Sequence, residues 1–439
     1  MKKLSYLLFA LITLCFGCRK DKPGRPISSS ASGFNIQVLK GNSQKDTVGN
    51  LLKDSVKIKV SNSGSVQLSN YIVQFKRSNC QDITVTEQTL PATGLASFGW
   101  YLSGQAGGQS LEIILLDNNH KRIDSTSISA TGIVGGAGWH RGGCVQNFEI
   151  NGVSTLSSGR LLSSVNAVDY PYYSDDNAVS WLPLKSFSNG HFIDKIISGG
   201  SNQVFIATDD EGLFYSKDNG QTWANISGGI EDPTGFADFA YTPSGKLIYS
   251  DNSGVYISSD MGATWADASS GLPFGQSVNP CEELNGDLYI IGSDGELYKS
   301  TNEGSIWTNL GSSKGNILLA SVESLFIDAN GYMYLSNPHN GPGTQGGIFR
   351  STDQGKTWAN LFLKGEVGSS YPNITDISKM NGSYYFSFAG RGVYRTANFT
   401  NYSNLANQFA GDGLLSYTVA KNSNFVIGSP GFGIFYYVP

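Results

Sequence analysis

One eight-residue turn pattern recurs along the last two-thirds of the chain and constrains the fold more than any other feature. The pattern is Ser-x-Asp-x-Gly-x-Thr-Trp, and its clearest copies begin at Ser216, Ser258 and Ser351. Copies that carry substitutions begin at Ser174, Ser300 and Thr396. The copies from Ser174 to Ser300 are each 42 residues apart. A repeat of this length predicts a propeller, a solenoid or another array of similar units.

Short apolar runs surround each copy of the pattern. Leu213–Tyr215 precedes the copy at Ser216, and Gln203–Ala207 lies ahead of that run. Runs of this length with aromatic and β-branched residues are typical of strands. Each repeat is therefore expected to supply four strands, with the turn pattern between the third and the fourth.

The pattern in this position resembles the Asp-box, or BNR repeat, which is known from sialidases, sortilin-type receptors and xyloglucanases. The resemblance covers residues 146–439 and implies a β-propeller. Third strands recur seven times, from Tyr172-Tyr173 to 434–438, which predicts seven blades. The outer strand of the last blade is expected from residues 146–150, which would close the ring. A six-bladed ring would have to discard residues 150–182, and an eight-bladed ring needs a repeat that the sequence lacks.

The chemistry of the pattern predicts a structural role. Ser hydroxyl and Asp carboxylate groups can accept hydrogen bonds from backbone N–H groups across a tight turn. Glycine permits a positive φ, and the tryptophan is expected to pack on its own turn or on the neighbouring blade. The tryptophans of these turns are therefore not expected to be available for a ligand.

The region before the repeats predicts a smaller β domain. Alternating runs in residues 34–132 predict a β-sandwich that resembles an immunoglobulin-like or fibronectin-type domain. Residues 133–145 are rich in glycine and are expected to form a linker. With 54 glycines, 12% aromatic and 15% charged residues, the composition fits a turn-rich all-β protein. The predicted fold is an all-β chain in which a seven-bladed β-propeller follows a small immunoglobulin-like sandwich.

The N-terminus predicts export. Lys2 and Lys3 precede an apolar run at 4–14 that is too short to span a bilayer. Cys18 follows, and residues 19–33 form a polar tether. Residues 1–18 resemble a bacterial lipoprotein signal with Cys18 as the lipidated residue, although Cys15 stands where that family prefers leucine. An ordinary secretory signal is the alternative. We expect a lipid-anchored protein of the cell envelope, in the outer membrane.

The remaining cysteines and the net charge limit the partners. A bridge between Cys80 and Cys144 is compatible with an exported protein, and Cys281 is expected to be a buried apolar residue. The net charge is −5, and no basic run follows the first residues. Nucleic acid is therefore not an expected partner. We expect a monomer that binds no cofactor and no metal, because the four histidines lack ligand spacing.

Turns between third and fourth strands share one face of a propeller, so the ligand is expected on the opposite face. The candidate ligand-binding residues in the loops of that face are Asp209, Asp210, Glu211, Asp251, Asp294, His339, Tyr371 and Arg391. The aspartates can alternatively serve only to start turns.

Catalysis is less well supported than binding. Sialidases need three arginines and a Tyr–Glu pair, and no residue of that set can be assigned here. A glycosidase needs two carboxylates about 5–10 Å apart, and Asp209, Asp251 and Asp294 occupy matching loops. We therefore predict noncatalytic binding of a protein or polysaccharide at the cell envelope. The alternative is a carbohydrate-active enzyme, a hydrolase or lyase, acting at the central mouth of the propeller.

Overall fold

A computed structural model of the chain describes most residues after the N-terminal segment. The described residues are 33–48, 50–77, 85–103, 107–133, 136–145, 149–165, 170–187, 192–209, 211–230, 236–251, 254–273, 279–292, 294, 296–310, 324–337, 347–361, 374–388, 392–405, 416–429 and 433–438. Their regular structure is almost entirely β. No helix within these ranges is long and apolar enough to cross a membrane.

The N-terminal strands form two sheets. One sheet has the order β1-β3-β6 and contains β1 (Phe34–Lys40), β3 (Val56–Asn62) and β6 (Leu95–Phe98). The other has the order β2-β8-β7-β4-β5 and contains β2 (Gln44–Thr47), β8 (Arg122–Ile133), β7 (Gly107–Asp117), β4 (Tyr71–Arg77) and β5 (Val85–Thr89). A short 3-10 turn, η1 (Leu68–Asn70), precedes β4.

These two sheets enclose one hydrophobic core. Alternate residues of β3, Val56 and Ile58 among them, are buried against Phe75 of β4 and Ile113 of β7. The alternation arises because successive side chains of a strand point to opposite faces. The period-2 runs of the sequence therefore predicted which residues of β3 form this core.

The remainder of the described chain forms seven four-stranded sheets. The first three contain β10 (Ile150–Thr155), β11 (Leu161–Val165), β12 (Tyr172–Ser174) and β13 (Leu182–Pro183); β14 (Ile193–Ser198), β15 (Val204–Thr208), β16 (Gly212–Ser216) and β17 (Ala224–Asn225); and β18 (Phe236–Tyr241), β19 (Leu247–Asp251), β20 (Val255–Ser258) and β21 (Ala266–Asp267). The next two contain β22 (Asn279–Leu284), β23 (Asp287–Ile291), β24 (Leu297–Ser300) and β25 (Thr308–Asn309); and β26 (Ser324–Ile327), β27 (Met333–Asn337), β28 (Gly347–Ser351) and β29 (Ala359–Asn360). The last two contain β30 (Ile374–Met380), β31 (Ser383–Phe388), β32 (Gly392–Thr396) and β33 (Ser403–Asn404); and β34 (Ser416–Val419), β35 (Phe425–Ser429), β36 (Gly433–Val438) and β9 (Gly138–Arg141).

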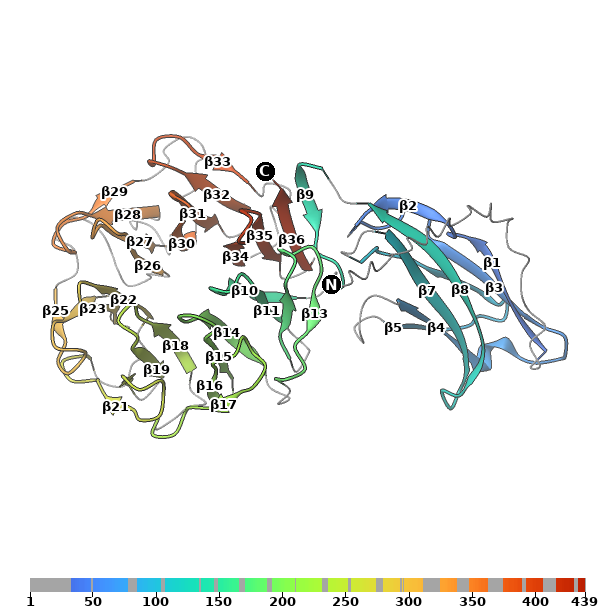
Figure 1. The fold of residues 1–439 in the computed structure, drawn as a ribbon, viewed down its shortest axis with the longest axis horizontal. Coiled ribbons are helices and arrows are strands. Elements are labelled where there is room, and N and C mark those ends of the chain that lie inside the picture. Colours follow the sequence, from blue (N-terminus) through green and yellow to red (C-terminus); the bar gives the residue numbers. More distant parts are fainter. Residues whose placement is uncertain are drawn as a thin grey trace, which may run out of the picture.

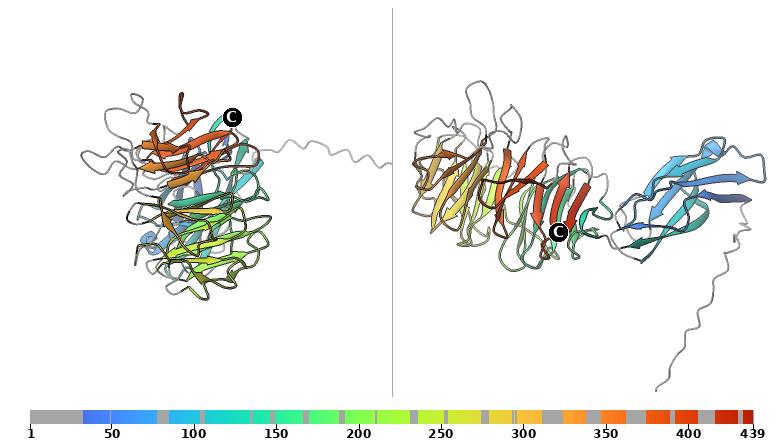
Figure 2. Two further views of the ribbon diagram at one scale, coloured as in Figure 1. Left: turned by 90° about the vertical axis from the view of Figure 1, so that its left-hand side faces the viewer. Right: turned by 90° about the horizontal axis from the view of Figure 1, so that it is seen from above.

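The four-stranded sheets stand side by side around a ring, with the first strand of each unit nearest the centre (Figure 1). This arrangement is a β-propeller, as the sequence predicted. The view from above shows the ring edge-on, with the N-terminal sheets beside it (Figure 2). Neighbouring sheets share apolar cores: Phe205 and Ala207 of β15, for example, pack with Leu247 and Tyr249 of β19.

The last sheet is completed by a strand from the start of the ring region. β9 (Gly138–Arg141) pairs antiparallel with β36, with Tyr437 opposite Trp139. Our expectation that residues 146–150 supply this strand was wrong, because Ile150 begins β10, the inner strand of the first sheet. Part of the segment that we predicted as a linker, residues 133–145, is therefore a strand. The glycines on both sides of this strand made the segment resemble a linker in the sequence. Within the strand, the ring of Trp139 packs on that of Tyr437 at a centroid distance of 5.4 Å.

Arg141, the last residue of β9, and Cys144 lie between the N-terminal sheets and the ring in the sequence. The guanidinium of Arg141 lies 5.0 Å from the ring centroid of Tyr101 and 4.9 Å from that of Phe435. Cys144 is buried and disulfide-bonded. The predicted partner, Cys80, lies outside the described residues, so the Cys80–Cys144 pairing stays a prediction. The side chain of Cys281 is likewise not described.

Candidate functional site

The repeated turn is closed by its own side chains. In the copy at Ser351, the Ser351 hydroxyl donates to Asp353 Oδ1 at 2.8 Å and accepts from Gly355 N at 2.8 Å. Asp353 accepts from Thr357 N at 2.8 Å and from Thr357 Oγ1 at 2.6 Å. These hydrogen bonds hold the pKa of Asp353 at about 2, because they are made to its ionised form. The chemistry predicted for the turn is confirmed.

The tryptophans of the turns use two different acceptors. Trp223 and Trp358 donate from Nε1 to a carbonyl of their own turn, to Gly220 O and Gly355 O at 3.1 Å. Trp265 instead donates to Ile226 O in the preceding unit, 39 residues earlier, at 2.7 Å. Both alternatives expected from the sequence therefore occur, and both keep these indoles in structural contacts.

Antiparallel order divides the loops between two faces of the ring. Connections from first to second and from third to fourth strands lie on one face, which we call the motif face because it carries the repeated turns. Connections from second to third strands and between sheets lie on the opposite face. Asp209 and Glu211 flank the β15–β16 connection on the opposite face and are exposed. Asp251 ends β19, but its side chain is not among those described.

Four of the predicted ligand-binding residues, Asp210, His339, Tyr371 and Arg391, lie outside the described residues. Asp294 is described, and its carboxylate accepts hydrogen bonds from residues of its own turn. Its Oδ2 accepts from Tyr298 OH at 2.6 Å, and its Oδ1 accepts from Glu296 N at 3.1 Å. Burial and the Asp294 carboxylate together raise the pKa of Tyr298 to about 12. The alternative in which this aspartate starts a turn therefore accounts for its contacts.

An exposed aromatic residue and two acidic residues lie close together along the backbone on the opposite face. Phe192, just before β14, is 53% exposed, and its carbonyl accepts a hydrogen bond from Asp209 N at 3.2 Å. Asp194 follows at a β-bulge, where the register shifts between Ile193 and Lys195. Burial and then the nearby Asp209 raise the pKa of Asp194. Asp194 and Asp209 therefore lie within electrostatic reach of each other.

The sequence analysis missed Phe192 and Asp194. The signal that could have found them is their position at the start of an inner strand, directly after a connection between sheets. We call Phe192, Asp194 and Asp209 the aromatic corner. It contains an apolar surface and acceptor groups, which together suit a ligand with both C–H faces and hydroxyl groups.

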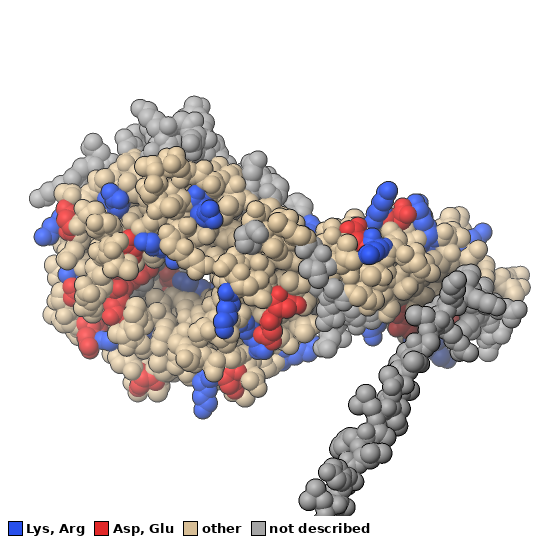
Figure 3. Space-filling model, turned by 45° about the horizontal axis from the view of Figure 1, so that its top comes forward, with Lys and Arg blue, Asp and Glu red and all other residues tan. Residues whose placement is uncertain are grey.

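Charged side chains also come from the inner strands. Lys195 of β14 forms an ion pair with Asp238 of β18. Burial raises the pKa of Glu282, on β22, to about 8, and Lys195 partly offsets this rise. The space-filling view shows acidic and basic side chains beside the opening at the centre of the ring (Figure 3).

A buried polar cluster joins two neighbouring sheets on the motif face. Asp328, after β26, has a fully buried side chain and accepts from Tyr384 OH of β31 at 2.8 Å. Tyr384 OH is 2.9 Å from Tyr334 OH and accepts from Lys379 Nζ at 3.0 Å. Burial alone would raise the pKa of Asp328, but hydrogen bonds from Tyr384 and from backbone N–H groups, together with the Lys379 charge, lower it. The cluster is closed to ligands and stabilises the contact between the sheets.

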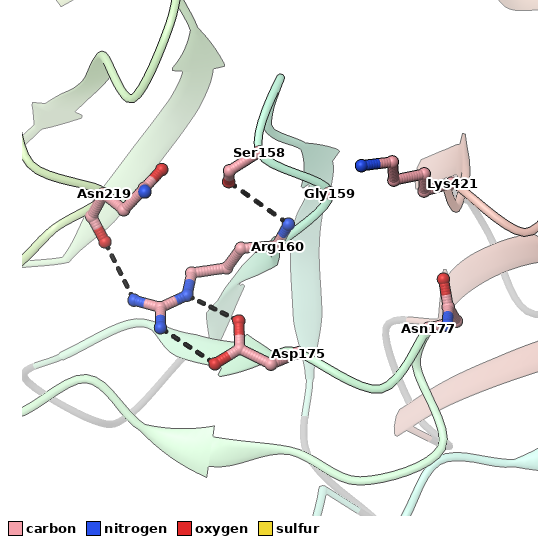
Figure 4. A pocket seen from close by; sticks show the side chains of 7 residues that line it. All are labelled: Ser158, Gly159, Arg160, Asp175, Asn177, Asn219 and Lys421. Atoms are coloured by element: carbon pink, nitrogen blue, oxygen red, sulfur yellow. Dashed lines mark hydrogen bonds and ion pairs between the residues drawn. The ribbon is translucent and has the colours of Figure 1, made fainter.

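A cavity of about 250 Å³ opens on the motif face. It is lined by Ser158, Gly159, Arg160, Asp175, Asn177, Asn219 and Lys421. These residues come from the β10–β11, β12–β13, β16–β17 and β34–β35 connections, hence from the first, second and last sheets of the ring (Figure 4). No residue of this cavity was predicted as a site, because the sequence analysis placed the ligand on the opposite face.

Metal binding has no support in the part of the chain that the structure describes. Within it, no group of three or more His, Cys, Asp or Glu residues is arranged to hold a metal ion. His339, the one histidine that the sequence analysis singled out among the loops, is not within that part.

Comparisons with known proteins support the fold. A family model, the DUF6242 beta propeller domain, matches residues 246–345. No curated protein matches the chain.

Several solved structures resemble the chain. YCF48 from Cyanidioschyzon merolae is 14% identical, with a TM-score of 0.51 over 69% of this chain and 99% of that one. The extracellular domain of the putative hybrid two-component system BT3049 from B. thetaiotaomicron is 16% identical, with a TM-score of 0.52 over 69% of this chain and 42% of that one. A GH74 xyloglucanase from Xanthomonas campestris is 16% identical, with a TM-score of 0.50 over 79% of this chain and 48% of that one. The chain thus spans less than half of the last two proteins, and identities this low show the fold alone.

Proposed function

We propose that the protein is a lipid-anchored protein of the cell envelope whose propeller binds a polysaccharide or protein without catalysis. Polysaccharide is the ligand class that the described residues favour. The ring of four-stranded sheets is taken as a seven-bladed Asp-box propeller, closed by β9, and the N-terminal sheets as an immunoglobulin-like spacer. Because propellers with different activities share this fold, the fold itself favours neither binding nor catalysis.

The observation that carries the proposal is the aromatic corner. Phe192 is 53% exposed, on the face that the sequence analysis selected for the ligand. Flat apolar rings bind the C–H face of a sugar. Asp209, whose backbone N–H donates to the Phe192 carbonyl, carries a carboxylate that can accept hydrogen bonds from hydroxyl groups. Nearer the centre, Lys195 and Asp238 are paired with each other.

A glycan array with the purified protein, followed by calorimetry on the best ligands, tests this proposal. We expect Phe192→Ala to weaken binding about fivefold, since an aromatic contact of this kind contributes on the order of 1 kcal/mol. Ile306→Ala is the matched control, because Ile306 is 55% exposed but lies in a repeated turn on the motif face. Equal effects of the two substitutions would refute a ligand at the aromatic corner.

Catalysis by a carbohydrate-active enzyme is the second candidate. It is favoured by the raised pKa of Asp194 beside Asp209, because a general acid must hold its proton near the working pH. Release of reducing ends or of unsaturated products from a polysaccharide panel would establish turnover. Loss of that turnover in Asp194→Asn, with binding retained, would assign the acid. No turnover on any bound polysaccharide leaves the noncatalytic proposal standing.

The anchor and the location are proposed from the N-terminal sequence. Cys18 would carry the lipid and residues 19–33 would act as the tether, in the outer membrane. Cys18→Ala is expected to release the protein from the membrane fraction, with loss of palmitate labelling. Unchanged partitioning would refute the anchor. Light scattering at the peak of a sizing column tests the expected monomer.

A further inference from the structure

The cavity on the motif face lies where the ring closes. Ser158, Arg160 and Asp175 belong to the first sheet, while Lys421 belongs to the β34–β35 connection of the last sheet. Asn219 adds a wall from the second sheet. The cavity therefore exists only when the first and last sheets are side by side, and we call it the seam pocket.

One side of the seam pocket is formed by an arginine that is already paired with a carboxylate. Arg160 donates from Nε to Asp175 Oδ1 at 2.7 Å and from a terminal nitrogen to Asp175 Oδ2 at 2.8 Å. Its other terminal nitrogen donates to Asn219 O at 2.9 Å, and its guanidinium lies 4.4 Å from the ring centroid of Tyr173. The fork of Arg160 is therefore occupied, and the pair with Asp175 is neutral in sum.

The opposite side carries a cation without a partner among the described residues. Lys421 is exposed, and in Figure 4 it extends from the last sheet toward Gly159. Gly159 has φ +94°, and a Cβ there would lie 2.9 Å from Lys421 Cδ. The absence of a side chain at Gly159 thus leaves room for the stem of Lys421. Together with the neutral pair, Lys421 gives the pocket one net positive charge.

Groups that can bind hydroxyls complete the wall. The Asn177 amide oxygen accepts from Asn422 N at 3.4 Å, which leaves its Nδ2 group without a hydrogen bond among the described residues. The Ser158 hydroxyl accepts from Arg160 N at 3.4 Å and is exposed enough to donate elsewhere. Gly159 N donates to Leu156 O at 2.8 Å in the turn that carries Ser158, and Asn424 Nδ2 donates to Asn177 O at 3.3 Å. These contacts hold the two turns in place.

We propose that the seam pocket binds one acidic sugar residue, a uronic acid unit, of an envelope or extracellular polysaccharide. One carboxylate would pair with Lys421, and the sugar hydroxyls would bond Asn177 and Ser158. The proposal rests on the proposed recognition of polysaccharide and adds to it a second site, on the other face of the ring, and the chemical class of the sugar.

Charge and size favour this ligand. A phosphate dianion would require a second available cation, but Asp175 already occupies the fork of Arg160. A cavity of about 250 Å³ is smaller than most drug-sized sites, which suits a single sugar unit. The lining is polar, whereas an acidic peptide would be expected to find apolar anchor positions as well.

Polygalacturonate and its fully methyl-esterified form are the probes, because esterification removes only the carboxylate charge. We expect the full chain to bind the free acid and to bind the ester at least tenfold more weakly, as for the loss of a charged hydrogen bond. Lys421→Gln should abolish that preference. Lys356→Gln is the matched control, since Lys356 is exposed in the repeated turn at Ser351, away from the seam pocket.

The outcomes separate this inference from the proposed function. A preference for the free acid that Lys421→Gln removes and Lys356→Gln leaves intact supports the seam pocket. Equal binding of acid and ester, a preference unaffected by Lys421→Gln, or no binding of any uronate polymer overturns it. In those cases, binding of another glycan that depends on Phe192 would leave the proposed function in place. Binding of acidic peptides but not of uronates would overturn the assignment to sugars.

Discussion

Removing the Asp328 carboxylate is expected to destabilise the ring strongly. Asp328 has no exposed side-chain surface, and it accepts from Tyr384 OH at 2.8 Å, Asn330 N at 2.9 Å and Tyr332 N at 3.1 Å. Asp328→Ala leaves these donors, and the Lys379 ammonium 3.5 Å away, without their acceptor. Breaking a buried charge pair in this way typically costs about 3–5 kcal/mol.

The expected shift in melting temperature follows from that free energy. Unfolding entropy is about 2 cal/mol/K per residue, so the melting temperature of a ring of roughly 300 residues that unfolds as one unit falls by about 7 °C for a loss of about 4 kcal/mol. Differential scanning calorimetry at pH 7 measures this change in melting temperature. The ion pair of Asp287 and Lys299 provides the control, because Asp287 is 31% exposed. Asp287→Ala should cost less than about 1 kcal/mol.

Acid titration tests the same reasoning independently. The pKa of Asp328 is lowered in the folded state, so its contribution is present above the unfolded pKa and is lost as the pH falls through the folded pKa. The difference in melting temperature between the wild-type protein and Asp328→Ala should therefore shrink as the pH falls below about 4. A shift smaller than that of Asp287→Ala at pH 7, or one that does not depend on pH, would show that the cluster does not stabilise the ring as argued.

Three further predictions concern the turns and the contact with the N-terminal sheets. Gly262 and Gly286 both have φ near +85°, but only at Gly262 would a Cβ lie 2.6 Å from Ile226 Cβ. Gly262→Ala should therefore destabilise the protein by about 1–3 kcal/mol more than Gly286→Ala in thermal unfolding. Equal losses of stability would contradict the packing argument. The folded pKa of Asp353 is about 2, so the melting temperature of Asp353→Asn should fall less between pH 4 and pH 2 than that of the wild-type protein. The same fall in both proteins would contradict a stabilising role of this carboxylate. Arg141→Ala removes the contact shared by Tyr101 and Phe435, so X-ray scattering should report a broader distribution of distances between the N-terminal sheets and the ring; an identical profile would mean that other contacts hold them.

The repeat made the ring predictable because its information is local. Ser351, Asp353 and Gly355 bond within eight residues of each other, so the pattern specifies the turn without reference to the rest of the chain. The closing strand was misplaced for the opposite reason. Gly138–Arg141 has no alternating pattern of its own and becomes a strand only because β36 offers an unpaired edge.

The candidate sites were harder to predict because they depend on contacts between sheets. Asp209 was selected from its loop position, but its neighbours Phe192 and Asp194 precede it by more than a strand and were not recognised. The seam pocket combines Arg160 with Lys421, which are 261 residues apart in sequence. Pairings of this kind follow from ring closure, which single-sequence patterns do not encode.

The first copy of the repeated turn also contacts the last sheet across the seam. In that copy Ala178 replaces glycine with φ +73°, and Asn177 occupies the preceding left-handed position with φ +60°. Across the seam, Asn422 N donates to Asn177 Oδ1 at 3.4 Å and Asn424 Nδ2 donates to Asn177 O at 3.3 Å. Asparagine tolerates the left-handed region and also supplies the oxygen that the last sheet requires. The same turn therefore joins the two ends of the ring and orients one wall of the seam pocket, so substitutions at Asn177 should affect ring stability and uronate binding together, whereas Lys421→Gln should affect binding alone.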